Sequence, residues 1–300
     1  MKNQNSNRYL FLLVLTILAM YSSAQNKKSF QEDMTEWKQK RIAALKAPNG
    51  WLNLTGLYWL KPGKNNFGSA STNEIVYQHK DMPKNAGYFL YENKQVYWVT
   101  AETVKITIKD SGVSKVLVYE EGKQVAPLLA LGSLRWNIIQ RDDKIGIRLR
   151  DLQSPKLSSF KGCERYKDDS TWRLNARFEK KQENKLLITN VLGQTNAQES
   201  PGKLIFSIAG KEYQLDALGE GNELFILFGD ATSGKGTYPA GRFLYADLPD
   251  AKGNTIIDFN KAFNPPCAFT IYATCPLPPK QNILPIAIKA GEKDHLGGRR

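Results

Sequence analysis

Apolar residues recur at helical intervals near the start of the chain and at alternate positions along much of the rest. Within residues 25–50 the helical period is carried by Phe30, Met34, Trp37, Ala44 and Leu45. Ser29 and Glu32 have the spacing of a capping box, and Pro48-Asn49-Gly50 ends the pattern. These residues predict one amphipathic helix that packs on a domain.

Short alternating runs begin after this helix and continue to about Arg150. Each run is rich in β-branched and aromatic residues and is bounded by turn sequences such as NAG and KDSG. The runs are EIVYQ, GYFLYE, QVYWVT, VKITIK, KVLVYE and KIGIRLRD. Because no helical pattern lies between them, residues 51–155 predict a β-sandwich.

A polar segment, residues 151–169, separates these runs from a second series. It holds a Ser-Pro pair and a charged stretch, which is typical of a connector. The second series begins with STWRLNARFE and continues with KLLITNVLG, KLIFSIAG, KEYQLDAL, ELFILFGD, GRFLYADL and NTIIDFN. Residues 156–292 therefore predict a second antiparallel β domain, a barrel or a sandwich, and the chain as a whole is expected to be mainly β.

The first 24 residues predict a secretory signal peptide. Lys2 and Arg8 precede an apolar run, Tyr9–Met20, that is too short to span a bilayer, and small residues precede Gln25. No cysteine stands near this point to carry a lipid anchor, and no later run is long enough for a transmembrane segment. The sequence therefore predicts a periplasmic or secreted protein, with a mobile tail at residues 293–300.

Charge and histidine content argue against several classes of function. The chain has 42 Lys and Arg against 29 Asp and Glu, but the lysines are interleaved with acids and no basic helix is evident. We therefore do not expect nucleic-acid binding. The two histidines, His79 and His295, leave almost no base for Ser-His-Asp or Cys-His catalysis and exclude a multi-histidine zinc site.

A proline-rich stretch, residues 263–285, contains two of the three cysteines. In an oxidising compartment Cys267 and Cys275 are expected to form a disulfide, with Cys163 left free. Simple burial of the two cysteines is the alternative, and a redox role is disfavoured because their spacing differs from Cys-x-x-Cys. Since prolines prevent further strands, the stretch predicts an ordered strap laid across the second β domain.

The first series of runs resembles a forkhead-associated domain. LKPGKNNFGSASTNEIVY looks like its beginning, and GYFLYENKQVYWVT, VLVYEEGKQV and LLALGSLRWNII follow in the family's order. The resemblance implies a phosphothreonine-binding sandwich, but Ser69 stands where the family's arginine should follow Gly68, and Asn85–Tyr88 read NAGY instead of Ser-x-x-His. Because phosphothreonine recognition relies on a cationic partner, we expect the fold without phosphopeptide binding.

Residues 228–292, together with the upstream WLNLTGLYWLKPGKNNFGS, resemble the domain of unknown function 1684 family of exported bacterial proteins. This resemblance covers nearly all of the chain after the signal peptide. It implies the two-part layout and brings no activity, cofactor or metal.

The residues of this region give one candidate ligand site in the second β domain. Its members are Asp230, Tyr238, Arg242, Asp258 and Asn260, which stand at strand ends around the loop DATSGKGTY. The loop lacks the spacing of a Walker motif. We expect these residues to bind a polar or anionic small molecule, such as a glycan or a cell-envelope fragment, with Arg242 on an anionic group.

Three other interpretations stay open. A buried pair between Arg242 and Asp258 would be purely structural. A hydrolase would use Asp258 or Asp230 as general base, with or without a metal. A structural envelope protein would show an exposed apolar patch in place of a pocket.

Overall fold

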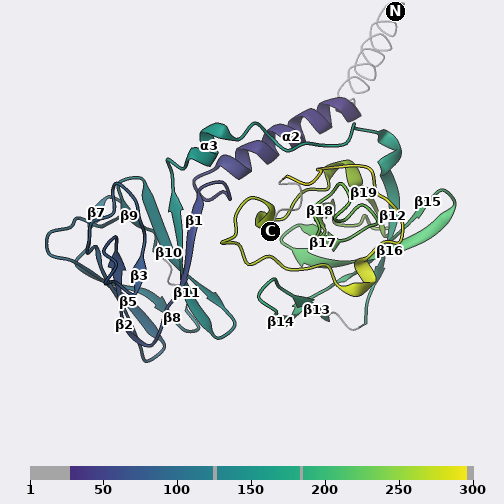
Figure 1. Ribbon diagram of the computed structural model, residues 1–300. Helices are drawn as coiled ribbons and strands as arrows, with labels where there is room; N and C mark the ends of the chain where they lie inside the picture. The colour runs from purple at the N-terminus through teal and green to yellow at the C-terminus, as the bar shows by residue number, and fades with distance from the viewer. Residues whose placement is uncertain (1–27, 124–126, 183–184, 296–300) are drawn as a thin grey trace, which may run out of the picture. The chain divides into compact units, whose positions relative to one another are not determined.

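The computed structural model describes residues 28–123, 127–182 and 185–295. The predicted signal peptide and residues 296–300 of the predicted tail lie outside these ranges. The described chain is mainly β, with an N-terminal helix followed by antiparallel sheets, as the sequence predicted (Figure 1). Within this part, no helix has the length and apolar character needed to cross a membrane.

The chain divides into two compact units between Lys40 and Arg41, inside helix α2 (Phe30–Lys46). The predicted capping box is present in the first unit. The Ser29 amide donates to Glu32 Oε2 at 2.8 Å, and the Glu32 amide donates to Ser29 Oγ at 3.2 Å. These bonds satisfy two amides at the helix start that have no partner within the helix.

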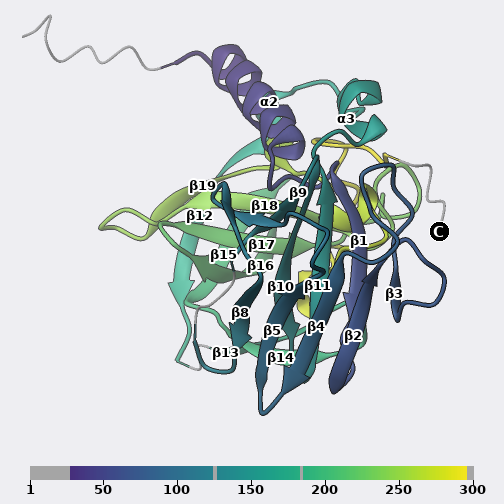
Figure 2. The same cartoon turned by 90° about the vertical axis from the view of Figure 1, so that its left-hand side faces the viewer.

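Strands β1 to β11 form the first β part of the second unit. One sheet has the order β1 (Leu54–Trp59), β11 (Lys144–Asp151), β10 (Leu134–Arg141), β9 (Leu129–Leu131), β6 (Thr107–Ile108) and β7 (Ser111–Gly112). The other has the order β3 (Ile75–Val76), β2 (Gly63–Gly68), β4 (Gly87–Glu92), β5 (Gln95–Thr100) and β8 (Lys115–Glu120). Figure 2 shows β1, β11 and β10 side by side.

Aromatic side chains from the two sheets meet in one core. The ring of Phe67 lies 5.5 Å from that of Trp136 and 6.2 Å from that of Trp98, and the two indoles are 5.7 Å apart. All three side chains are inaccessible to solvent. Their edge-on packing gives the first β part a hydrophobic core of its own.

The second β part consists of a curled sheet and a separate hairpin. After the short helix α3 (Pro155–Ser159), the sheet has the order β18 (Arg242–Asp247), β17 (Glu223–Phe228), β16 (Lys211–Glu220), β15 (Gly202–Ile208), β12 (Arg173–Lys180) and β19 (Asn254–Asp258). Its outer strands approach each other, and Thr255 Oγ1 on β19 donates to the carbonyl of Asp247 on β18 at 2.8 Å. The sheet is therefore a nearly closed barrel. The hairpin pairs β13 (Lys185–Thr189) with β14 (Thr195–Glu199).

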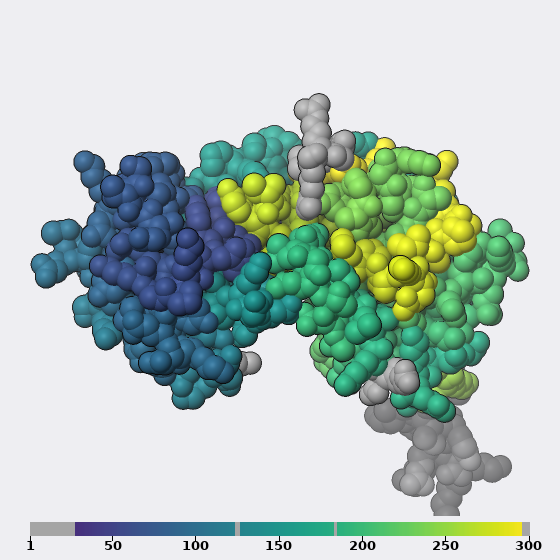
Figure 3. Space-filling model, turned by 60° about the horizontal axis from the view of Figure 1, so that its bottom comes forward, coloured from purple at the N-terminus to yellow at the C-terminus, as the bar shows by residue number. Residues whose placement is uncertain are grey.

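Residues 259–295, the described part of the chain after β19, cross this part without forming another strand. Their regular elements are short 3₁₀ turns at Phe259–Lys261, Pro266–Ala268 and Lys280–Asn282, and a disulfide joins Cys267 to Cys275. Figure 3 shows this segment, in yellow, on the surface beside the green strands. CAFTIYATC forms turns despite its β-forming residues, because prolines and the disulfide hold it outside the sheet.

The described end of the predicted tail is bonded to the second β part. The Lys293 amide donates to the carbonyl of Glu164 at 2.8 Å, and the His295 ring lies 4.9 Å from that of Phe269. These contacts attach residues 293–295 to the second β part, and the mobility expected of residues 293–300 stays a prediction.

Asn282 fastens the strap to the barrel. Its Nδ2 donates to the carbonyls of Asp216 and Leu227 at 2.9 and 2.8 Å, and its Oδ1 accepts from the Asp216 amide at 2.8 Å. The side chain is completely buried.

Asn282→Ala should lower the free energy of unfolding by about 2–4 kcal/mol, because three buried backbone groups lose their partner. Urea denaturation monitored by tryptophan fluorescence measures the change. The exposed Asn175→Ala on β12 serves as the control and should stay within about 0.5 kcal/mol of the parent. Equal effects of the two substitutions would contradict the role given to Asn282.

Candidate functional site

The structure places the five predicted ligand-site residues inside the second β part. None of Asp230, Tyr238, Arg242, Asp258 and Asn260 is more than 6% exposed. Tyr238 belongs to an apolar cluster with Leu227 and Phe243. The polar residues fall into two pairs, Asp230 with Arg242 and Asp258 with Asn260.

Arg242 bonds to protein acceptors. Nη2 donates to Asp230 Oδ2 at 2.7 Å and to the carbonyl of Ile288 at 3.0 Å, while Nη1 donates to the carbonyls of Ala290 and Glu292. Its partner is thus Asp230, whereas the structural interpretation from the sequence named Asp258. Burial lowers the pKa of Arg242, and the neighbouring Asp230 opposes that shift. This arrangement ties residues 288–292 to β18.

Asp230 also organises the loop that follows β17. Its Oδ1 accepts from the amide and the hydroxyl of Thr232, and Thr232 Oγ1 lies 2.9 Å from Thr237 Oγ1. The Gly- and hydroxyl-rich loop is therefore closed on itself by side-chain bonds. Both carboxylate oxygens of Asp230 serve the fold, which leaves this residue poorly suited to act as a general base.

Asp258 differs because only one of its carboxylate oxygens is bonded. Oδ1 accepts from the amide and from Nδ2 of Asn260 at 3.0 and 2.9 Å. Oδ2 is shielded from solvent and accepts no hydrogen bond from any described residue, and Arg173 Nε lies 4.0 Å away. Burial raises the pKa of Asp258, although the bonds from Asn260 counteract the shift.

Asn260 links Asp258 to the connector. Its Nδ2 donates to the carbonyl of Asp169 at 2.8 Å, and its Oδ1 accepts from the Asp169 amide at 3.0 Å. An asparagine that pairs with a backbone in this way cannot also hold a ligand with the same atoms. No set of three or more His, Cys, Asp or Glu side chains within the described ranges is arranged to hold a metal ion.

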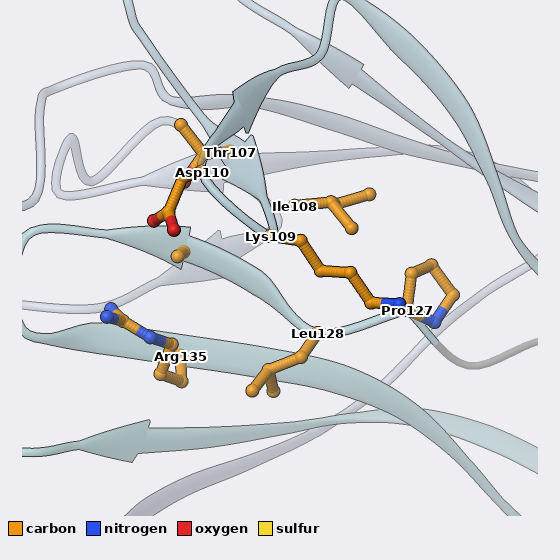
Figure 4. A pocket seen from close by; sticks show the side chains of 8 residues that line it. Thr107, Ile108, Lys109, Asp110, Pro127, Leu128 and Arg135 are labelled. Atoms are coloured by element: carbon orange, nitrogen blue, oxygen red, sulfur yellow. The ribbon is translucent and has the colours of Figure 1, made fainter.

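A pocket that the sequence analysis did not identify lies in the first β part, where the β6–β7 hairpin approaches β9 and β10 (Figure 4). Its volume is about 680 Å³. It is lined by Thr107, Ile108, Lys109, Asp110, Pro127, Leu128, Ala130 and Arg135. Its signal in the sequence is the turn KDSG, which by itself predicts only a boundary between strands.

The hairpin turn at this pocket has an unfavourable backbone conformation for its residues. Lys109 has φ 46° and Asp110 has φ 67°, and the flanking residues Ile108 and Ser111 are paired. Two-residue turns with positive φ at both positions favour Asn-Gly, because side chains with a Cβ are strained there. The β4–β5 turn at Asn93-Lys94 has the same conformation, so the β6–β7 turn is a functional candidate because a pocket also lies beside it.

Charged groups lie toward both ends of the pocket. Figure 4 shows the Arg135 guanidinium and the Asp110 carboxylate at one end and Pro127 at the other, with Leu128 between them and the Lys109 side chain extending toward Pro127. Arg135 Nη1 donates to the carbonyls of Gly132 and Leu134, both at 2.8 Å, which holds the guanidinium in place. The Arg135 guanidinium has further N–H donors on Nε and Nη2.

One match to a known protein family covers most of the second β part. Residues 158–293 match the family described as "Protein of unknown function (DUF1684)". The match supports the resemblance to this family and is consistent with an activity that is not yet known. None of the curated proteins matches the chain.

Three solved structures share partial likeness. An uncharacterized protein of Haloarcula marismortui is 29% identical, covers 47% of this chain and 80% of its own, and has a TM-score of 0.39. The FhaA FHA domain, in complex with an intracellular domain, and a domain from a study of phosphothreonine-dependent FHA interactions are each 12% identical, with TM-scores of 0.23. Each covers 31% of this chain, and 97% and 92% of its own chain, respectively. These TM-scores are too low to assign fold or function.

The raised pKa of Asp258 predicts a pH-dependent effect of Asp258→Asn. The native state holds the proton more tightly than the unfolded state, whose aspartate titrates near 3.9, so the parent loses stability as pH rises through the native pKa. As pH rises from acidic to neutral, the free energy of unfolding of Asp258→Asn should increase relative to that of the parent. The difference should exceed about 0.5 kcal/mol, the usual range for substitutions at the surface.

Urea denaturation at several pH values checks this expectation. Asp250→Asn is the matched control, because hydrogen bonds from the Asn254 and Lys252 amides lower the pKa of the exposed Asp250. That variant should lose stability relative to the parent as pH rises. The same sign for both variants would contradict the assignment to Asp258.

Proposed function

We propose that this chain is an exported binding protein whose ligand joins an anionic group to an apolar part and binds at the β6–β7 pocket. The observation that carries the proposal is the strained Lys109-Asp110 turn, which holds charged side chains over an apolar wall. A fragment of the cell envelope with an acyl or aromatic portion has this chemistry.

The size and lining of the pocket support this ligand class. Small-molecule sites commonly measure about 300–1,000 Å³ and are mostly apolar with a few polar groups, and this pocket of about 680 Å³ falls within that range. Ile108, Pro127 and Leu128 provide the apolar surface. Arg135 can bind a carboxylate or phosphate through two parallel N–H groups, and Lys109 adds a second positive charge.

This location differs from the one expected from the sequence. The five residues in the second β part use their polar atoms mainly on other protein groups, and a ligand would have to displace those bonds. Export of the protein stays a proposal based on residues 1–24. The disulfide between Cys267 and Cys275 supports it, because disulfides persist mainly in oxidising compartments.

We also propose that the first β part is a forkhead-associated-like sandwich that does not bind phosphothreonine. The order of its sequence motifs supports the fold, and Ser69 in place of the family's arginine supports the loss of that ligand. A ligand at the β6–β7 pocket would then be a different use of the same framework.

A hydrolase is the second candidate function. The raised pKa of Asp258 and its unbonded Oδ2 favour a role as general base. Substrate would need to reach an oxygen that is shielded from solvent, so the geometry favours binding at the β6–β7 pocket.

The anionic dye 8-anilino-1-naphthalenesulfonate can test the proposed pocket, with its uncharged analogue N-phenyl-1-naphthylamine as a second probe. The double substitution Lys109→Asn with Asp110→Gly introduces the preferred turn residues and removes the charges. It should stabilise the protein by about 1 kcal/mol. Lys109→Asn alone removes one positive charge and should weaken binding of the anionic dye about tenfold, the effect of one lost charged contact.

Arg135→Gln should weaken binding of the anionic dye and leave binding of the uncharged dye nearly unchanged. The matched control is Lys94→Gly in the β4–β5 turn, where Asn93 and Lys94 also have positive φ. This control should relieve similar strain without affecting either dye. Fluorescence titration gives the affinities, and unchanged dye binding in both pocket variants would refute the proposed location.

A further inference from the structure

Arginines gather on the face of the first sheet that points away from its core. On β11, Ile145, Ile147 and Leu149 belong to the core, so the alternate residues Arg148 and Arg150 project from the opposite face. Trp51 lies between them, with its ring centre 5.3 Å from Cζ of Arg148 and 5.8 Å from Cζ of Arg150.

The guanidinium of Arg150 donates hydrogen bonds to acceptors within the protein, whereas one edge of the Arg148 guanidinium has no acceptor among the described residues. Arg150 Nη1 donates to the carbonyl of Gly50 and, at 2.8 Å, to Asn53 Oδ1. Arg148 Nε and Nη2 are shielded from solvent, and neither donates a hydrogen bond to any described residue. A buried donor left unpaired costs about 1–3 kcal/mol, so this edge is a costly feature of the fold.

The charges near Arg148 increase that cost. Across β10 and β11, Arg135 stands opposite Arg150 and Asn137 stands opposite Arg148. Like charges in directly opposite positions repel each other. Burial lowers the pKa of Arg148 to about 10, and the neighbouring Arg141 and Arg150 contribute to the same shift.

Arg141 is held by the disulfide-closed loop. Its Nε donates to Thr274 Oγ1 at 2.8 Å, one residue before Cys275, and its Nη1 donates to the carbonyl of Gln140 at 2.7 Å. The third cation of the cluster is thus positioned by the strap.

We propose that Arg148 binds a small oxyanion, with Arg141 and Arg150 adding favourable charge. Nε–H and Nη2–H point the same way along one edge of a guanidinium, which is the geometry that binds two oxygens of a carboxylate, phosphate or sulfate. Because Nε and Nη2 are shielded from solvent, an anion reaches them only when the groups around them move, which suits a small inorganic ion better than a large ligand. Arg135, which lines the β6–β7 pocket, stands opposite Arg150, so the two proposed sites are neighbours on one sheet.

Thermal unfolding in sodium phosphate tests the site. The full mature chain is measured at pH 7, and chloride is added to keep the ionic strength constant. Above the dissociation constant, the melting temperature should rise with the logarithm of the phosphate concentration, by roughly 3 °C for each tenfold increase. Arg148→Met should raise the melting temperature without phosphate, because it removes an unpaired buried charge, and should abolish the phosphate response.

Arg148→Lys keeps the charge without the two-donor edge and should weaken phosphate binding about tenfold. Arg177→Met removes an exposed arginine on β12 and should leave the response unchanged. Sulfate and acetate titrations separate a preference for tetrahedral anions from general oxyanion binding. No response in the parent, or an intact response in Arg148→Met, would overturn the proposal.

The pocket substitutions separate this inference from the proposed function. Lys109→Asn with Asp110→Gly should leave the phosphate response intact, because neither residue belongs to the arginine cluster. Loss of dye binding with an intact phosphate response would show that the two sites are independent.

Discussion

The buried ion pair between Arg242 and Asp230 fixes the last part of the described chain. Both side chains are 1% exposed, and the guanidinium also donates to three carbonyls of residues 288–292. One side chain therefore joins β18, the loop after β17 and residues 288–292, which follow the strap. Loss of one partner from a buried pair costs about 3–5 kcal/mol, because the other charge stays buried.

Side-chain bonds replace strand pairing along the strap. Residues 263–285 contain six prolines, which lack the amide donor that a sheet requires. The segment is held instead by Asn282 on β16 and β17 and by the fully buried Glu292, whose Oε2 accepts from the Asn264 amide at 2.7 Å. Arg41 Nε lies 3.0 Å from the same carboxylate. Such a segment is rigid because its polar groups are individually anchored.

Buried polar groups without a partner occur in both β parts. In the second part, Arg242 and Asp230 pair with each other, but Arg242 Nε and Asp258 Oδ2 have no hydrogen-bond partner among the described residues. In the first part, Arg148 keeps an edge without an acceptor, and the Lys109-Asp110 turn holds an unfavourable backbone conformation. Folded proteins rarely retain such costs without a reason. Only in the first part do a pocket and a cluster of arginines, among the described residues, accompany these costs, and both proposed binding sites lie there.

The sequence by itself determined the elements. Helical and alternating periods are local properties of the backbone, so they predicted the N-terminal helix, its Ser29–Glu32 cap and the mainly β fold. The spacing and compartment of Cys267 and Cys275 likewise predicted their disulfide, which is present.

Only the tertiary structure decided which polar groups meet. Arg242 lies opposite Phe228 on β17, two residues before Asp230, whereas Arg173 is the residue opposite Asp258. Arg148 and Arg150 look equivalent along β11, yet only Arg150 receives acceptors, from Gly50 and Asn53 about a hundred residues away. Hydrogen-bond partners depend on strand register and on contacts between distant segments, and no local pattern in the chain encodes them.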